Sequence, residues 1–202
     1  MMNAAPGERY TIRRKILTLV GASFHVYDPE GNVVAFCRQK AFKLREDMRL
    51  YTDESMSSEL LTMKARSVID FGATYDVTLP DGQVLGSLRR KGLKSILRDQ
   101  WLVFAPGDAG TKGATPMATI IEDSGFKAFS RRFVPYVGLF MPQKMHMKAA
   151  DGREIATFRQ HFNLFVYRLG VAIHHEDERF DDLLALAAGC LLAAIEGRQD
   201  SA

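Results

Sequence analysis

Residues 180–197 read FDDLLALAAGCLLAAIEG, and no other stretch of the chain constrains the fold so strongly. Every position from Leu183 to Ile195 is apolar or small, so in an α-helix the leucines point to nearly all sides. Its thirteen or so apolar residues are fewer than the roughly 17–25 that cross a bilayer, which favours a helix surrounded by protein. Asp181 is the predicted N-cap and Gly197 the predicted left-handed C-cap.

The composition is that of one globular domain. The chain has 202 residues, of which 47% are hydrophobic, and it contains no linker rich in Pro, Gly or Ser. We expect a disordered N-terminus over 1–8, a single domain over 9–197 and a tail over 198–202. The formal net charge of +3 is far below that of a dedicated nucleic-acid binder, so nucleic acid is an unlikely partner.

Cysteine usage and the first residues indicate a reducing compartment. Cys37 and Cys190 are too few for a disulfide framework, and no signal peptide opens the chain. We therefore expect a cytoplasmic protein without a transmembrane span. Because Cys190 lies within the apolar helix, its thiol is expected to be buried and inert.

From Tyr10 to about residue 170, apolar and polar residues mostly alternate, which is typical of β-strands. This pattern predicts ten to twelve strands before the helix. An eight-stranded barrel is filled by its own side chains, so enclosing a helix needs about eleven or twelve strands. The predicted fold is mainly β, a closed antiparallel barrel of about 12 strands around a C-terminal hydrophobic helix. Thirteen segments have strand character, but some in the middle are weakly marked, so ten to twelve strands are expected from 10–16, 24–27, 33–38, 48–52, 60–65, 68–71, 75–79, 84–90, 96–104, 117–122, 145–148, 155–159 and 162–169.

The sequences of three predicted hairpins align with one another without gaps: 25–40, 76–91 and 146–161. Each has a turn glycine, which supplies the positive φ that the turn needs. Seven residues after each glycine comes an arginine. We expect these three arginines to lie at equivalent positions on the returning strands and to be largely exposed. The glycines are Gly31, Gly82 and Gly152, and the arginines are Arg38, Arg89 and Arg159.

These features resemble the Tubby C-terminal-like group, and most closely the LURP-one-related family, which also resembles the phospholipid scramblases. The resemblance covers about residues 9–197. It is carried by the hairpin turns at 28–32, 80–83 and 151–152, by KGLKSILRDQW at 91–101, and by the terminal helix. It implies a barrel of about twelve strands around a central helix. Tubby domains bind phosphoinositides and scramblases move lipids, but the chain lacks the spaced acids of a calcium loop, which disfavours scramblase activity.

Two basic clusters are candidate binding sites for lipid headgroups. The first is Arg89, Arg90, Lys91 and Lys94, whose charges suit phosphates. The second is Lys127, Arg131 and Arg132, interleaved with a phenylalanine stripe that a short helix would place on one side. The alternative is that the cations form solvated faces and that the stripe packs on the barrel wall. The stripe is Phe126, Phe129 and Phe133.

Motifs for catalysis and metal binding are weak. His174 and His175 precede three acids, but no distant His or Cys pair has ligand spacing, so a solvated turn is expected. Residues 107–115 depart from the phosphate-loop order, and there is no nucleophile elbow or HExxH motif. We therefore expect no enzyme activity, no cofactor and no metal. The expected function is peripheral binding of anionic phospholipids; the alternative is a protein-interaction or scaffolding domain without a lipid ligand.

Overall fold

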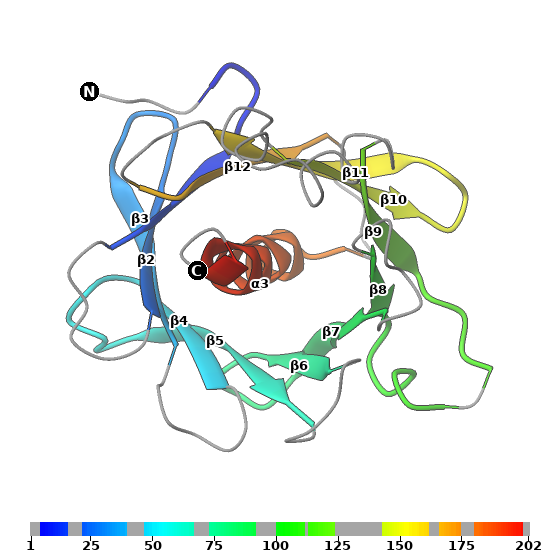
Figure 1. Cartoon of the computed structure of the whole chain (residues 1–202). Helices are drawn as coiled ribbons and strands as arrows, with labels where there is room; N and C mark the ends of the chain where they lie inside the picture. The colour runs from blue at the N-terminus through cyan, green and yellow to red at the C-terminus, as the bar shows by residue number, and fades with distance from the viewer. Residues whose placement is uncertain are drawn as a thin grey trace.

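The computed structural model describes residues 5–15, 22–39, 47–66, 73–91, 100–111, 113–123, 143–161, 166–174 and 180–199, with side chains up to Ile195. In this part of the chain, twelve β-strands form a closed antiparallel barrel and one α-helix runs through its centre (Figure 1). The fold class predicted from the sequence is confirmed.

Along the described part of the chain, the twelve strands come first and the helix follows them. Their bounds are β1 (Tyr10–Arg14), β2 (Ala22–Tyr27), β3 (Val33–Gln39), β4 (Asp47–Tyr51), β5 (Glu59–Ala65), β6 (Thr74–Thr78), β7 (Val84–Arg90), β8 (Gln100–Phe104), β9 (Ala118–Glu122), β10 (Lys144–Ala149), β11 (Glu154–His161), β12 (Arg168–Ile173) and α3 (Asp182–Gln199).

Strands that follow one another in sequence pair with one another, and β1 pairs with β12 to close the barrel. In the closing pair, Ile12 lies opposite Leu169 and both side chains are buried inside. Alternate residues of each strand point inward, so the apolar half of each alternating pattern faces the helix. Closure also pairs the free edges that an open sheet would expose.

Helix α3 is buried on all sides, as its composition requires. The Leu183 amide donates to Asp181 Oδ1 at 2.8 Å, which confirms Asp181 as the N-cap. All residues from 184 to 194 are buried. Gly189 permits close packing, because a Cβ there would lie 2.8 Å from Ile12 Cδ1. In the described residues, no helix combines the length and the apolar character that crossing a membrane would need.

The three repeated hairpins share one backbone geometry. Gly31, Gly82 and Gly152 have φ values of 89°, 91° and 87°. Each hairpin also has the same bulge, in which the residue three positions after the glycine is skipped in the pairing. The skipped residues are Val34, Leu85 and Ile155.

The predicted equivalence of the three arginines is confirmed by this register. Each arginine lies opposite the residue eight positions before its turn glycine: Ser23 for Arg38, Thr74 for Arg89 and Lys144 for Arg159. All three occupy positions on the outer face of the barrel. Arg38 and Arg159 are exposed, but Arg89 is half-buried, so the prediction of exposure is wrong for Arg89.

Two predicted boundaries are wrong. The helix continues through Gly197 to Gln199, so Gly197 is not its C-cap. The last strand is predicted at 162–169, but β12 is Arg168–Ile173 and begins only after residues 166–167; residues 162–165 lie outside the described part of the chain. Gly170 therefore lies inside a strand, where it leaves room for the side chain of Glu8. The strand predicted at 68–71 lies outside the described residues.

Candidate functional site

The first predicted basic cluster begins at the end of β7, where Arg89 and Arg90 lie on opposite faces of the sheet. Successive side chains of a strand alternate between the two faces. Arg90 is opposite Trp101, which is buried inside the barrel, so Arg90 has the inward orientation at the barrel rim. The cluster is therefore divided between two faces rather than gathered on one.

Arg89 lies on the outer face, where it stacks on an aromatic ring. Its guanidinium carbon is 4.5 Å from the centroid of the Phe104 ring, a distance typical of cation–π contacts. Lys91, two residues further on, has the same outward orientation and is exposed. Its amide donates a hydrogen bond to the carbonyl of Gln100 at 2.8 Å. Arg89 and Lys91 therefore share one side of the barrel at the end of β7.

The remaining predicted contacts lie outside the described residues. They are Lys94 of the first cluster, the whole second cluster of Lys127, Arg131 and Arg132, and the stripe of Phe126, Phe129 and Phe133. Their roles stay predictions.

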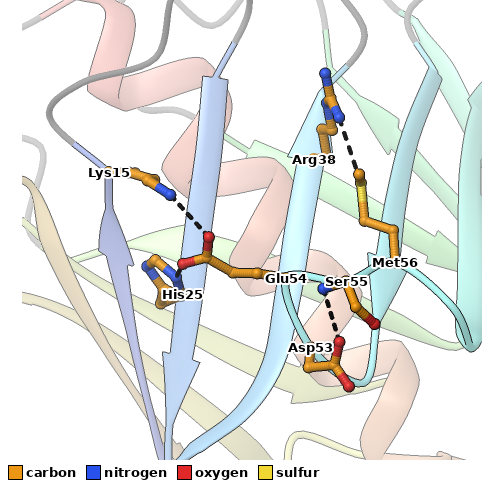
Figure 2. Close-up of polar contacts among 7 residues, drawn as sticks. All are labelled: Lys15, His25, Arg38, Asp53, Glu54, Ser55 and Met56. Atoms are coloured by element: carbon orange, nitrogen blue, oxygen red, sulfur yellow. Dashed lines mark hydrogen bonds and ion pairs between the residues drawn. The ribbon is translucent and has the colours of Figure 1, made fainter.

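A second group of cations, missed in the sequence, lies on the outer face of β1–β3 beneath the loop 52–58 (Figure 2). Lys15 Nζ donates to Glu54 Oε2 at 2.8 Å, and His25 Nε2 contacts Glu54 Oε1. Arg38 Nη1 donates to the sulfur of Met56 at 3.4 Å. His25 and Arg38 belong to the first repeated hairpin, but Lys15 and Glu54 lie outside it and show no motif spacing, so only folding reveals the group.

The charge on Glu54 is stabilised by its two partners. The hydrogen bond from Lys15, followed by that from His25, lowers the pKa of the Glu54 carboxyl below its usual range. The imidazole of His25 also contacts two aromatic rings, with centroid distances of 5.9 Å to Tyr27 and 5.3 Å to Phe36.

An ion pair with a buried hydroxyl partner connects β6, β7 and the end of β5. Arg66 donates two hydrogen bonds of 2.8 Å to the carboxylate of Asp76, and the buried Ser87 hydroxyl donates to Asp76 Oδ1 at 2.6 Å. Burial raises the pKa of Asp76, but the hydrogen bonds from Arg66 and Ser87 outweigh it and leave the pKa below its usual value. This arrangement fixes the geometry of neighbouring strands.

Two histidines share one carboxylate on the outer face of β10–β12. His146 Nδ1 lies 3.0 Å from Glu154 Oε2, and His174 Nε2 lies 3.2 Å from Glu154 Oε1. The Thr157 hydroxyl donates to Glu154 at 2.6 Å. The hairpin repeat is a signal that could have placed His146 opposite Thr157. His174 was expected in a solvated turn, and it is exposed, but it also makes these polar contacts.

Metal binding has no support in the described part of the chain. No group of three or more His, Cys, Asp or Glu side chains there is arranged to hold a metal ion. In the histidine pair, His146 already contacts carboxylates through both ring nitrogens, since Nε2 lies 3.4 Å from Asp123 Oδ1.

The chain's two cysteines meet in the core. Cys37 of β3 and Cys190 of α3 are both free thiols with no exposed surface. A hydrogen bond with Cys190, together with burial, raises the pKa of the Cys37 thiol well above its usual value. Because the thiolate is the reactive form, this pair is expected to be chemically inert in the folded protein.

Comparison with known proteins places the chain in one family. The LURP-one-related family matches residues 33–188, which extend from the start of β3 into α3. Strands β1 and β2 precede the matched segment and complete the barrel. No match was found among curated proteins or among solved structures. Because the match covers more than half of the chain and agrees with the barrel and its central helix, this protein belongs to the LURP-one-related family.

Proposed function

We propose that this protein is a non-enzymatic module that binds anionic phospholipid headgroups at the cytoplasmic surface of a membrane. The binding residues in this proposal are Arg89, Arg90, Lys91 and Lys94, with Lys127, Arg131 and Arg132 as a second contact. The observation that carries it is the outward placement of Arg89 and Lys91 at one end of β7. Among the described residues, no carboxylate forms an ion pair with Arg89 or Lys91, which supports this proposal.

The contact of Arg89 with Phe104 favours this role because it limits the motion of the guanidinium before a ligand arrives. A guanidinium is also well suited to phosphate, since it donates two parallel hydrogen bonds. Arg90 has the inward orientation, so it would bind a headgroup from the rim of the barrel rather than from its outer wall.

The expected affinity is low. Each Lys or Arg near an anionic membrane contributes about 1 kcal/mol, so four residues give roughly 4 kcal/mol and binding in about the millimolar range. Inserted phenylalanines would each add about 1.5–3 kcal/mol, because their apolar surface leaves water. Binding through the basic residues alone would therefore be reversible and sensitive to salt.

The test is co-sedimentation with vesicles of phosphatidylserine and phosphatidylcholine over a series of salt concentrations. The double variant Arg89→Glu with Lys91→Glu should lose binding, since it reverses both outward charges. The matched control is Lys144→Glu with Arg159→Glu, an opposed pair on the outer face of β10–β11 with the same total change in charge. The control should retain at least half of wild-type binding, and all three proteins should have similar melting temperatures.

Equal loss in both double variants would show a general effect of net charge and would contradict a site on β7. If the wild-type protein does not co-sediment with anionic vesicles even at low salt, the lipid proposal fails. The protein-interaction or scaffolding alternative would then take its place.

A further inference from the structure

The loop 52–58, between β4 and β5, contacts the outer face of β1–β3 through charged side chains (Figure 2). Three cations lie on that face: Arg13, Lys15 and Arg38. They occupy outward positions, because their neighbours Ile12 and Cys37 are fully buried in the core. His25 lies among them, directly opposite Arg13.

Arg13 and Lys15 lie on or directly after β1, and Arg38 lies on β3, so the three cations come from the two strands that flank β2. Lys15 bonds through its amide to the carbonyl of Ser23, and Ser23 lies opposite Arg38. Lys15 and Arg38 are thus two strand spacings apart, about 10 Å between backbones, which their long side chains can span. Arg13 is held in place by the Tyr27 ring, 5.3 Å from its guanidinium carbon.

Glu54 is the carboxylate that partly neutralises this group. It accepts from Lys15 at 2.8 Å and contacts His25, while its own side chain is half exposed to solvent. Within the described residues, Glu54 pairs with Lys15 and His25, whereas Arg38 contacts the sulfur of Met56 and Arg13 stacks on the ring of Tyr27. The two oxygens of the Glu54 carboxylate thus show that an anionic group can bind Lys15 and His25 at the same time.

The loop that carries Glu54 is strained. Met56 has a φ of 56°, the left-handed region that residues other than glycine rarely adopt. Two bonds within the loop support this turn: the Ser55 amide donates to Asp53 Oδ1 at 2.7 Å, and the Met56 amide donates to the Asp53 carbonyl at 3.2 Å. The contact of Met56 with Arg38 and the pairs made by Glu54 hold the loop on the strands.

We propose that Arg13, Lys15, His25 and Arg38 form a binding site for a phosphate monoester, which Glu54 occupies as an internal competitor. A phosphate monoester carries nearly two negative charges and three acceptor oxygens, so it satisfies these donors better than one carboxylate. Its binding displaces Glu54 and releases the loop 52–58 from the strands. This site goes beyond the function proposed above, since β2 and β7 lie five strands apart in the closed order.

The first experiment measures the affinity for inorganic phosphate by NMR at fixed ionic strength, with the Met56 methyl group as the reporter. Glu54→Gln should bind phosphate about two- to fivefold more tightly than the wild type, because it removes the competing charge. The matched control is Glu30→Gln, which removes the same charge from the exposed turn of the β2–β3 hairpin and should leave the affinity unchanged. Lys15→Gln with Arg38→Gln should abolish phosphate binding.

Two results would overturn the site: Glu54→Gln binding phosphate no more tightly than Glu30→Gln, or the Lys15→Gln, Arg38→Gln variant retaining wild-type affinity. None of the four substituted positions is buried, so each variant should melt within a few degrees of the wild type. Arg89→Glu with Lys91→Glu should not alter phosphate binding, which separates this site from the one on β7.

The source of the phosphate is identified by a second experiment on Glu54→Gln. Vesicles with phosphatidic acid present a phosphate monoester, whereas phosphatidylserine presents a diester of lower charge. Preference for phosphatidic acid, lost in Lys15→Gln with Arg38→Gln, supports the site with a lipid headgroup as its ligand. Binding of soluble phosphate without binding of either vesicle supports the site with a dissolved phosphorylated ligand. Absence of both kinds of binding overturns the site.

Discussion

Gly170 of β12 lies directly beneath the carboxylate of Glu8: a Cβ atom at Gly170 would stand 2.0 Å from Glu8 Oε1. The Glu8 carboxylate is buried there and is tied to two partners. Oε1 lies 2.6 Å from His161 Nε2, and Oε2 accepts from the Ala5 amide at 3.0 Å. The absent side chain of Gly170 thus makes room for contacts that attach the segment before β1 to the barrel wall.

Gly170→Ala should destabilise the protein by about 1–3 kcal/mol, because the methyl group displaces Glu8 from His161 and from the Ala5 amide. For a domain of this size, the melting temperature should fall by about 2–4 °C per kcal/mol. Thermal unfolding followed by circular dichroism measures this change.

A double-mutant cycle is the control for Gly170. In the background of Glu8→Ala the carboxylate is gone, so Gly170→Ala should cost markedly less than in the wild type. If the cost is the same in both backgrounds, the strand itself needs glycine there and Glu8 is not the reason.

Leu186→Asp should prevent folding. Leu186 is 3% exposed in the middle of α3, so the change removes apolar contacts and buries a charge, at a cost of about 5 kcal/mol or more. That is comparable with the whole stability of a domain, about 5–15 kcal/mol. Soluble expression and circular dichroism provide the measurement. Leu183→Asp is the matched control, since Leu183 is half-buried in the first turn and should remain folded.

Asp76→Asn should destabilise the protein by about 1–3 kcal/mol at pH 7, because Arg66 and Ser87 lose a charged acceptor. The folded state lowers the pKa of Asp76 below its usual value of 3.8, so the stabilisation is complete above that value and is lost as the pH falls through the lower pKa. The difference between wild type and variant in urea unfolding should therefore shrink below about pH 4.

The control for Asp76 is Asp108→Asn, at an exposed position in the loop after β8. It should change the urea midpoint little at any pH. A difference for Asp76→Asn that stays constant down to pH 2 would show that the charge of Asp76 does not stabilise the fold.

Cys37 and Cys190 should resist alkylation in the native protein and react only on unfolding, since both are buried and the pKa of Cys37 is raised. Mass spectrometry after iodoacetamide treatment, with and without denaturant, measures this. Modification of either thiol in the native protein at the rate of a free peptide would show that the barrel opens around α3.

Short-range patterns in the sequence were sufficient to predict the barrel and its central helix. The all-apolar stretch 183–195 requires enclosure, and alternation with glycine turns predicts antiparallel hairpins. The equal spacing from turn glycine to arginine predicted a common register, which the shared bulges confirm. These features depend on residues within one element or one hairpin, so the local sequence encodes them. The alternation could also have placed Arg89 and Arg90 on opposite faces.

Contacts between distant elements depended on barrel closure. Glu8 meets Gly170 because β1 pairs with β12, Cys37 meets Cys190 because the helix fills the lumen, and Glu54 reaches Lys15 because the loop 52–58 extends over neighbouring strands. No spacing in the sequence encodes such pairs, since their distance along the chain is set by all the strands between them. The charged face of β1–β3 and its internal carboxylate therefore emerge only once twelve strands have closed around one helix.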